Sequence, residues 1–179
     1  MRLEKDFYKN HAFIVGPMLI GKLLVRKLEN GEIMKHRITE TEVYFGEEDA
    51  ACHARFGRTD RSEILYNEGG YAYIYLCYGI HNLLNVVTGE KNHPEAVLIR
   101  AVEGYVGPGK LTKIMNITRE LNKIDLNNSD ELWIEDDGYI ADYYTAPRVG
   151  IDYAAEPFKS IQWRYIMKEI TEKDSKGLQ

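Results

Sequence analysis

The chain has 179 residues, of which 44% are apolar, and its formal net charge is −5. This size and composition suit one globular domain with one substantial core, so we expect a single domain over residues 1–179. No apolar run reaches the roughly 18 residues of a membrane-spanning helix, and the charged start MRLEKDFYKN lacks the apolar segment of a secretory signal. We therefore expect a cytoplasmic protein that is neither secreted nor membrane-bound.

The charges are segregated along the chain. Residues 47–49 carry −3 and residues 130–137 carry −5, and removing these −8 from the total of −5 leaves +3 for the remainder. Two basic stretches, 54–61 and 159–168, lie in that remainder. Local charge steers a ligand more than the overall sum does, so the acidic total does not exclude a polyanionic partner. Ordinary surface charge is the alternative explanation for each stretch.

Two helices are predicted before residue 60. The first covers residues 4–15, and Gly16-Pro17 should end it, because proline removes a backbone donor and clashes with the preceding turn. A second, short helix is predicted over residues 49–56, with Asp49 at its start. The core candidates of the first helix are Phe7, Phe13 and Ile14.

Strands dominate the rest of the chain. Asn30-Gly31 is a strong hairpin signal and joins the apolar segment 19–28 to the alternating strand 35–45. The other predicted elements are a strand pair around Gly79, strands over 96–103 and 131–136, a helix over 110–117, a loop over 147–154, and a strand or helix over 161–170. Strands joined by turns predict an α+β fold with a mostly antiparallel, curved β-sheet, flanked by helices and carrying a protruding β-hairpin.

Two glutamates and a tyrosine share one face of the strand in RITETEVYFG. Alternation places Ile38, Glu40, Glu42 and Tyr44 on that face. A carboxylate two residues from a tyrosine offers a base beside a flat stacking surface. Two such carboxylates raise each other's pKa unless a cation pairs with them. A solvated polar face is the alternative interpretation.

Two polar residues interrupt apolar strands. Asn85 lies within LLNVV, where a buried amide without a partner costs about 1–3 kcal/mol. It either bonds neighbouring backbone or reads the edge of a ligand. Arg100 closes AVLIR, and it either reaches solvent or pairs with a core carboxylate.

Four tyrosines occupy the segment YAYIYLCYG. Tyr71, Tyr73 and Tyr75 keep strict alternation and therefore share one face of a strand. Tyr78 breaks this parity directly before the glycine. An exposed turn tyrosine is the simple interpretation, and a side chain that projects from a hairpin corner toward a partner is the other.

GYVGPGKL matches the GxxxxGK of a phosphate-binding loop between a strand and a helix. Leu111 stands where the Mg²⁺-liganding Ser or Thr belongs, and Pro108 removes a cradling donor, which argues against an NTPase. Lys110 remains a candidate contact for a nucleic-acid phosphate. No HExxH or finger spacing surrounds His53, so we expect neither a metal nor a cofactor.

Taken together, these residues resemble the alkyladenine (3-methyladenine) DNA glycosylase family. The matching segments cover roughly residues 7–155 in the family's order and read FYKNHAFIVGPMLIGKLLV, ITETEVYFGEEDAACHARFGRT, YIYLCYGIHNLLNVV, AVLIRAVE, GPGKL and PRVGI. ETE-x-Y, YGxxxxxN and PRVGI together are the specific part of this match. The chain departs from the family in the arginine-rich loop, which reads RTDRSEILYNEGG, and at Pro17.

The resemblance implies roles for residues at matching positions. Glu42 would activate water, and Arg100 would help to orient that water. Tyr78 would fill the place that an extruded base leaves in the duplex. The implied walls of the base pocket are Tyr44, His53, Tyr75 and Asn85, of which Asn85 opposes the 2-amino group of normal guanine. We further expect DNA-backbone contacts at Arg55, Arg58, Lys110 and Arg148.

The implied activity is base excision repair. The enzyme would flip a damaged purine out of double-stranded DNA and hydrolyse its N-glycosidic bond. Expected lesions are 3-methyladenine first, then 7-methylguanine, hypoxanthine and ethenoadenine. A cationic alkylated purine leaves without prior protonation, so one carboxylate suffices for it.

No lysine lies near the Glu42 or Asn85 segments, so we expect a monofunctional enzyme that leaves an abasic site and has no lyase activity. We also expect a monomer, in a bacterial cell and close to the nucleoid. A non-catalytic module that stacks bases on its tyrosines is the alternative function. That alternative gives Glu42 and Asn85 no role.

Overall fold

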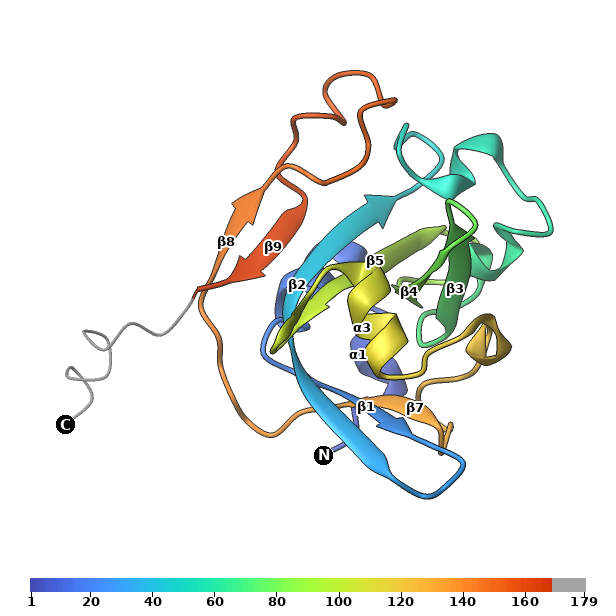
Figure 1. Ribbon diagram of the computed structural model, residues 1–179. Helices are drawn as coiled ribbons and strands as arrows, with labels where there is room; N and C mark the ends of the chain where they lie inside the picture. Colours follow the sequence, from blue (N-terminus) through green and yellow to red (C-terminus); the bar gives the residue numbers. More distant parts are fainter. Residues whose placement is uncertain (169–179) are drawn as a thin grey trace.

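The computed structural model describes residues 1–168 of the chain (Figure 1). The helices are α1 (Lys5–Tyr8), α2 (Ala12–Met18) and α3 (Pro108–Ile114), with 3₁₀ turns η1 (His53–Phe56), η2 (Glu63–Tyr66) and η3 (Arg119–Leu121). The strands are β1 (Leu23–Lys27), β2 (Ile33–Phe45), β3 (Ala72–Cys77), β4 (His81–Val87), β5 (Glu95–Val102), β6 (Tyr105–Val106), β7 (Leu132–Glu135), β8 (Tyr143–Ala146) and β9 (Arg164–Met167).

All pairings between these strands are antiparallel, in the order β3-β4-β5-β2-β1-β7, with β6 on β5 and β9 linking β8 to β2. The long strand β2 connects the parts of the sheet. Its first part pairs with β1, its second part pairs with β5, and residues 40–42 also pair with β9. The sheet curves from β3 to the β8–β9 pair (Figure 1), which confirms the predicted α+β class.

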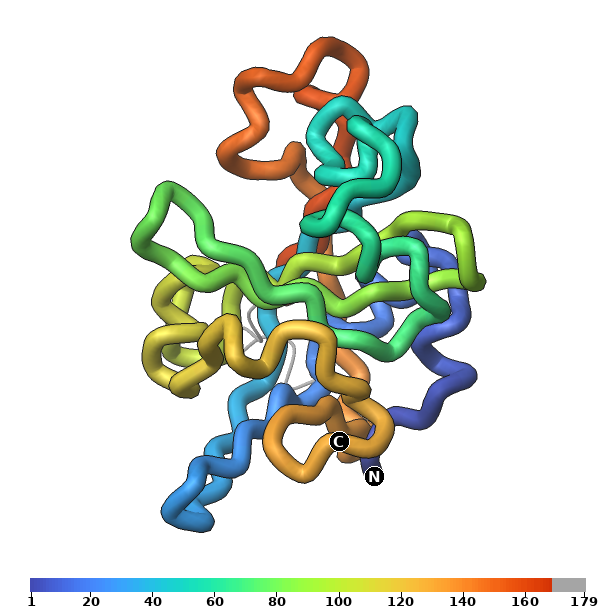
Figure 2. Tube along the Cα trace, turned by 90° about the vertical axis from the view of Figure 1, so that its right-hand side faces the viewer, coloured from blue at the N-terminus to red at the C-terminus, as the bar shows by residue number. Residues whose placement is uncertain are grey.

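Two hairpins project from the body of the molecule in Figure 2. One joins β1 to β2 around the predicted Asn30-Gly31 pair, and the other joins β3 to β4 at Tyr78 and Gly79. Tyr78 has a positive φ of 50° and an 86% exposed side chain. The protruding hairpin expected from the sequence is therefore present, with Tyr78 at its corner.

Alternation along the strands separates a core face from a second face that carries the tyrosines. On β3, Ile74 is buried in the main hydrophobic core, whereas Tyr73 and Tyr75 pack in a separate cluster with Cys52 and Leu65. The predicted parity of the β3 tyrosines is thus confirmed. Because the core holds one face, the other face is available for a site.

The expectation that Ile38 shares a face with the two glutamates is wrong. Ile38 packs in the same core as Val43, because the pairing of β2 with β5 shifts register between Ile38 and Glu40 and again between Glu40 and Thr41. Such an irregularity re-aims the side chains that follow it. Beyond it, Glu42 and Tyr44 keep their common face.

The predicted end of the first helix is also wrong. The chain breaks at residues 9–11, and α2 then continues through Pro17 to Met18. Proline in the last turn removes only one intrahelical hydrogen bond. Gly16, where a Cβ would lie 2.7 Å from a Val43 methyl, lets α2 rest directly on β2. Of the core candidates, Phe7 and Phe13 pack against the main core, but Ile14 is 47% exposed.

The other predicted elements are confirmed, apart from two unexpected strands and one short helix. Of the predicted 161–170 segment, residues 164–167 form strand β9, and residues 169–170 lie outside the described part of the chain. Strands β6 and β8 were not expected from the sequence. The helix predicted to start at Asp49 is the short 3₁₀ turn η1, which begins at His53 and is capped by the Cys52 sulfur.

The acidic stretch 130–137 lies against basic side chains of β1, β2 and the turn before them. Lys22 pairs with Asp136 at 2.8 Å, Lys35 pairs with Glu135 at 2.6 Å, and Arg37 pairs with Asp137 at 2.8 Å. These acids therefore neutralise cations of the fold. They are not a free negative surface that would repel a polyanion.

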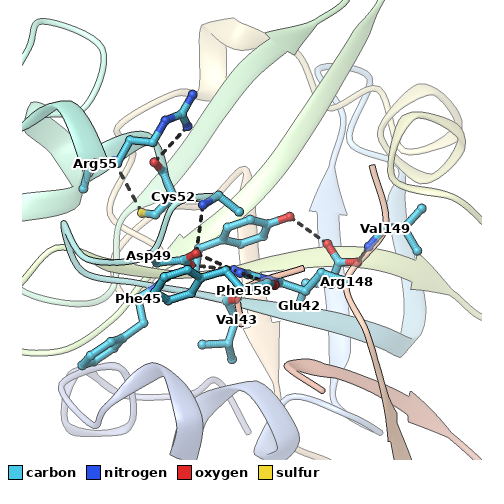
Figure 3. Close-up of polar contacts among 12 residues, drawn as sticks. Glu42, Val43, Phe45, Asp49, Cys52, Arg55, Arg148, Val149 and Phe158 are labelled. Atoms are coloured by element: carbon cyan, nitrogen blue, oxygen red, sulfur yellow. Dashed lines mark hydrogen bonds and ion pairs between the residues drawn. The ribbon is translucent and has the colours of Figure 1, made fainter. Parts of the chain in front are cut away.

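A buried ion pair fastens the segment after β8 to the end of β2 (Figure 3). The two terminal nitrogens of Arg148 donate to the carboxylate of Asp49 at 2.6 and 2.8 Å, and one of them also donates to the carbonyl of Val43. Both charged side chains have no exposed surface. The guanidinium carbon lies 4.7 Å from the ring centre of Tyr44 and 4.9 Å from that of Trp163.

Replacing Asp49 by alanine should therefore destabilise the protein strongly. The substitution leaves the Arg148 charge buried without a partner, for which we expect a loss of about 3–5 kcal/mol in the free energy of unfolding. Denaturant titration measures this, with Lys159→Ala as the control because Lys159 and Asp152 form an exposed pair. A loss for Asp49→Ala no larger than that of the control would contradict the structural role of the pair.

Candidate functional site

A cavity of about 620 Å³ opens on the tyrosine-bearing face of the sheet. This volume is in the range of small-ligand pockets. Its walls come from β3, β4 and β5, the η1 region, the start of α3 and the 149–153 segment. The lining includes seven of the residues selected from the sequence, namely Tyr44, His53, Tyr75, Tyr78, Asn85, Arg100 and Lys110.

Aromatic rings form one wall of the cavity. The rings of His53 and Tyr75 lie 4.6 Å apart at 74°, and the His53 Nδ1 is 2.8 Å from the hydroxyl of Tyr73. Burial, with smaller contributions from Arg61 and Arg55, lowers the pKa of His53 to about 4. The imidazole is therefore neutral at physiological pH and offers an uncharged surface for stacking.

Asn85 is held in place on β4. Its side chain is buried and lines the cavity, and its Nδ2 donates to the carbonyl of Tyr73 on the paired strand at 3.2 Å. The bond to neighbouring backbone, one of the two interpretations left open by the sequence, is thus confirmed, and the reading of a ligand edge stays a prediction. The backbone satisfies one donor of the amide and fixes its orientation, and the amide still faces the cavity.

The Glu42 carboxylate has no exposed surface, and it contacts residues that line the cavity, among them Val149 (Figure 3). One oxygen accepts the backbone N–H of Val149 at 2.8 Å and lies 3.5 Å from a terminal nitrogen of Arg100. The other oxygen accepts the hydroxyl of Tyr44 at 2.9 Å. All three partners line the cavity. Only these residues therefore separate the carboxylate from the space in which a ligand would bind.

Opposing effects act on the ionisation of Glu42. Burial raises its pKa above the usual range, and this is the largest effect. Arg100, the Val149 amide and the Tyr44 hydroxyl favour the ionised form, while nearby Glu40 disfavours it. A carboxyl whose pKa is raised by burial and which contacts the lining of a cavity is a candidate proton acceptor.

Two exposed apolar side chains stand at the tip of the β3–β4 hairpin, beside the mouth of the cavity. Tyr78 is 86% exposed and lines the cavity, and Ile80, across the glycine, is 74% exposed. Large exposed apolar groups on a projecting turn are typical of contact surfaces. The sequence had indicated Tyr78 through its parity but gave no signal for Ile80.

The four expected DNA-backbone contacts lie in different settings. Lys110 is exposed at the start of α3 beside the cavity. Arg58 is exposed and pairs with Glu63, and Arg55 lies over the rings of Phe56 and Tyr153.

The expectation for Arg148 is wrong. Its charged side chain is fully buried and bonded to Asp49, so it presents no donor to a phosphate at the surface. Arg148 instead supports the site indirectly, because its bonds to Asp49 fix the segment that carries Val149. The residue that follows it, Val149, donates its backbone N–H to Glu42, which residue types alone could not reveal.

The phosphate-binding-loop alternative does not fit the structure. The Leu111 side chain is fully buried in the main core, so the position that would ligate Mg²⁺ is apolar and points inward. Within residues 1–168 no group of three or more His, Cys, Asp or Glu side chains is placed to hold a metal ion. The helices of these residues are all too short to span a membrane.

The family model described as Methylpurine-DNA glycosylase matches residues 6–106 and 104–171. A protein of Borreliella afzelii named "Putative 3-methyladenine DNA glycosylase" is 41% identical over 93% of this chain and 96% of its own length. Proteins of the same name from Methanocella arvoryzae and Psychrobacter cryohalolentis are 41% and 43% identical, over 93% and 92% of this chain and 92% and 91% of their own lengths.

These matches span nearly the whole chain and include the segments that supply the cavity and Glu42. A non-catalytic stacking module is therefore the weaker alternative, since the relatives carry the name of an enzyme of DNA repair. The chain belongs to the methylpurine-DNA glycosylase family and is a DNA glycosylase.

Proposed function

We propose that this DNA glycosylase removes 3-methyladenine and related damaged purines from double-stranded DNA with a water molecule that Glu42 activates. The observation that carries the proposal is the buried carboxylate of Glu42, which accepts hydrogen bonds from Tyr44 and Val149 and forms an ion pair with Arg100, all three of them residues that line the cavity. The names of the relatives support 3-methyladenine as the first substrate to test.

The cavity suits a purine that has left the base stack. A base in a duplex cannot reach an enclosed site, so it has to be extruded at an expense of a few kcal/mol. The neutral ring of His53 and the ring of Tyr75 supply a stacking wall. The fixed amide of Asn85 would exclude bases that carry an extra amino group at its position.

The chemistry follows from the positions around Glu42. The oxygen of water attacks C1′ of the sugar, the bond from C1′ to the base nitrogen breaks, and the base leaves with the bonding electron pair. Glu42 takes the proton of the water, and its negative charge stabilises the cationic sugar in the transition state. Arg100 and the Val149 amide support this step, because both contact the carboxylate and both residues line the cavity in which the water would be bound.

Hydrolysis without strand cleavage is the product outcome that we propose. Lyase chemistry needs a lysine amine that is activated inside the site. Among the described residues that line the cavity, Lys110 is the sole lysine. It is exposed at the start of α3. It is better placed to contact a DNA phosphate than to attack a sugar.

Replacing Glu42 by glutamine tests the catalytic assignment. The amide keeps the shape of the side chain but cannot accept the proton, so we expect a loss of about 10²–10⁴-fold in the rate of 3-methyladenine release. Single-turnover assays on duplex DNA measure the rate, and binding to DNA with an abasic-site analogue should be retained. Release at the wild-type rate would remove Glu42 from the mechanism.

The rate should also depend on pH in a direction set by Glu42. Only the ionised carboxylate accepts a proton, and burial raises its pKa. Excision should therefore slow as pH falls, along an acid limb whose midpoint lies above the usual glutamate value of about 4.3. A single-turnover rate that stays constant down to about that pH would contradict the assignment.

Replacing Tyr78 by alanine tests whether the hairpin tip supports base flipping. The exposed side chain contributes little to the fold, but its ring could replace stacking that the duplex loses. We expect excision to slow about tenfold or more in duplex DNA, with a smaller effect on single-stranded DNA. Tyr144→Ala, an exposed tyrosine on β8, is the matched control. Equal duplex rates for both variants would leave Tyr78 an ordinary turn residue.

A further inference from the structure

Glu40 and Glu42 share a single arginine between them. The Nε of Arg100 donates to Glu40 at 3.1 Å, and a terminal nitrogen of the same guanidinium lies 3.5 Å from Glu42. Arg100 is thus closer to the carboxylate that has no proposed catalytic role. If it paired with Glu40 alone, Glu42 would lose the one cation that the described residues place directly against it.

A second arginine satisfies Glu40 from the other edge of β2. Arg164 on β9 donates to the same Glu40 oxygen at 2.8 Å, and its Nε donates to the carbonyl of Pro147 at 2.7 Å. In the β2–β9 register Arg164 stands opposite Glu42, so its guanidinium reaches diagonally to Glu40. It also fixes the chain two residues before the Val149 amide that holds Glu42.

The four side chains form a neutral set when all are ionised. Two arginines balance two glutamates, and all four are at most 23% exposed, so solvent screens their interactions only in part. Removal of Arg164 leaves the set with a net charge of −1, and removal of the Glu40 charge leaves it at +1. A net negative set disfavours the ionised form of Glu42, and a net positive set favours it.

We propose that Arg164 is a positioning residue for base excision, which holds Glu40 so that the Arg100 guanidinium remains shared with Glu42. The proposal rests on the catalytic role proposed above for Glu42. It assigns to Arg164 a function that its place in a basic stretch did not indicate, because ordinary surface charge or a DNA contact explained that stretch equally well.

Other groups near Glu42 do not change the sign of this effect. Tyr44 on β2 and the amide of Val149 are neutral donors. Arg148 lies behind the Tyr44 ring, but its charge is balanced by Asp49. The charge state that Glu42 experiences is therefore set chiefly by Arg100, Glu40 and Arg164.

The test compares how the single-turnover excision rate of each variant falls at low pH, that is, the acid limb of its pH–rate profile. The enzyme is kept at saturating concentration, so that weaker DNA binding does not affect the measured rate. Arg164→Gln should move the limb to higher pH by about 0.5–1 unit, because the set becomes negative. Glu40→Gln should move it to lower pH. The double variant restores neutrality, so its limb should return close to that of the wild type.

Two controls separate local charge from other effects. Arg164→Lys keeps the charge and should leave the limb nearly in place. Lys35→Gln removes a positive charge at the far end of β2, where Lys35 pairs with Glu135, and should not move the limb. A shift for Lys35→Gln as large as that for Arg164→Gln would assign the effect to overall charge and overturn the proposal.

The outcomes also distinguish this proposal from the proposed function. If Glu42→Gln remains active, the catalytic assignment fails. If Glu42→Gln is inactive but the Arg164→Gln and Glu40→Gln limbs stay in place or move in the same direction, only the role of Arg164 fails. Should Arg164→Gln not fold, the double variant still tests Arg164, because it leaves no unpaired charge at Glu40. A limb close to that of the wild type supports the proposal, and a limb as low as that of Glu40→Gln alone overturns it.

Discussion

The complete burial of the Glu42 carboxylate is the constraint on which the site depends. An ionised group without exposed surface is tolerated only where donors and opposite charge surround it. Its partners come from three parts of the chain, since Tyr44 lies on β2, Arg100 on β5 and Val149 in the segment after β8. The strand that carries Glu42 therefore needs neighbours on both edges, and the sheet order supplies β5 on one edge and β9 on the other.

The clamp between Arg148 and Asp49 links this constraint to the shape of the cavity. It joins the end of β2 to the segment that closes one side of the site, next to the amide that bonds Glu42. The rings of Tyr44 and Trp163 flank its guanidinium and shield it from water. A site built on a strand and a buried ion pair is held more rigidly than one built on loops alone, which suits the role in catalysis that we propose for Glu42.

Local patterns predicted much of the fold, because they depend on properties of neighbouring residues. Alternation placed Tyr73 and Tyr75 on one face, and Asn30-Gly31 marked the β1–β2 turn. The errors arose where distant packing overrides a local rule. α2 continues through Pro17 because Gly16 rests on β2, and Asp49 does not start a helix because it pairs with Arg148, 99 residues away in the chain. In the site, side-chain types indicated the cavity wall, but a backbone donor such as Val149 carries no signature in a sequence.

The central claim is that its surroundings make Glu42 a base with a raised pKa. Its most direct test is a carbon NMR titration of side-chain-labelled glutamate, in which the signal of Glu42 is the one that Glu42→Gln removes. The claim predicts that this signal titrates above the usual glutamate range, since burial outweighs the favourable contacts of Arg100, Val149 and Tyr44. Its midpoint should coincide with the acid limb of excision. A Glu42 signal that titrates at or below the usual range, or at a pH different from that of the limb, would contradict the claim.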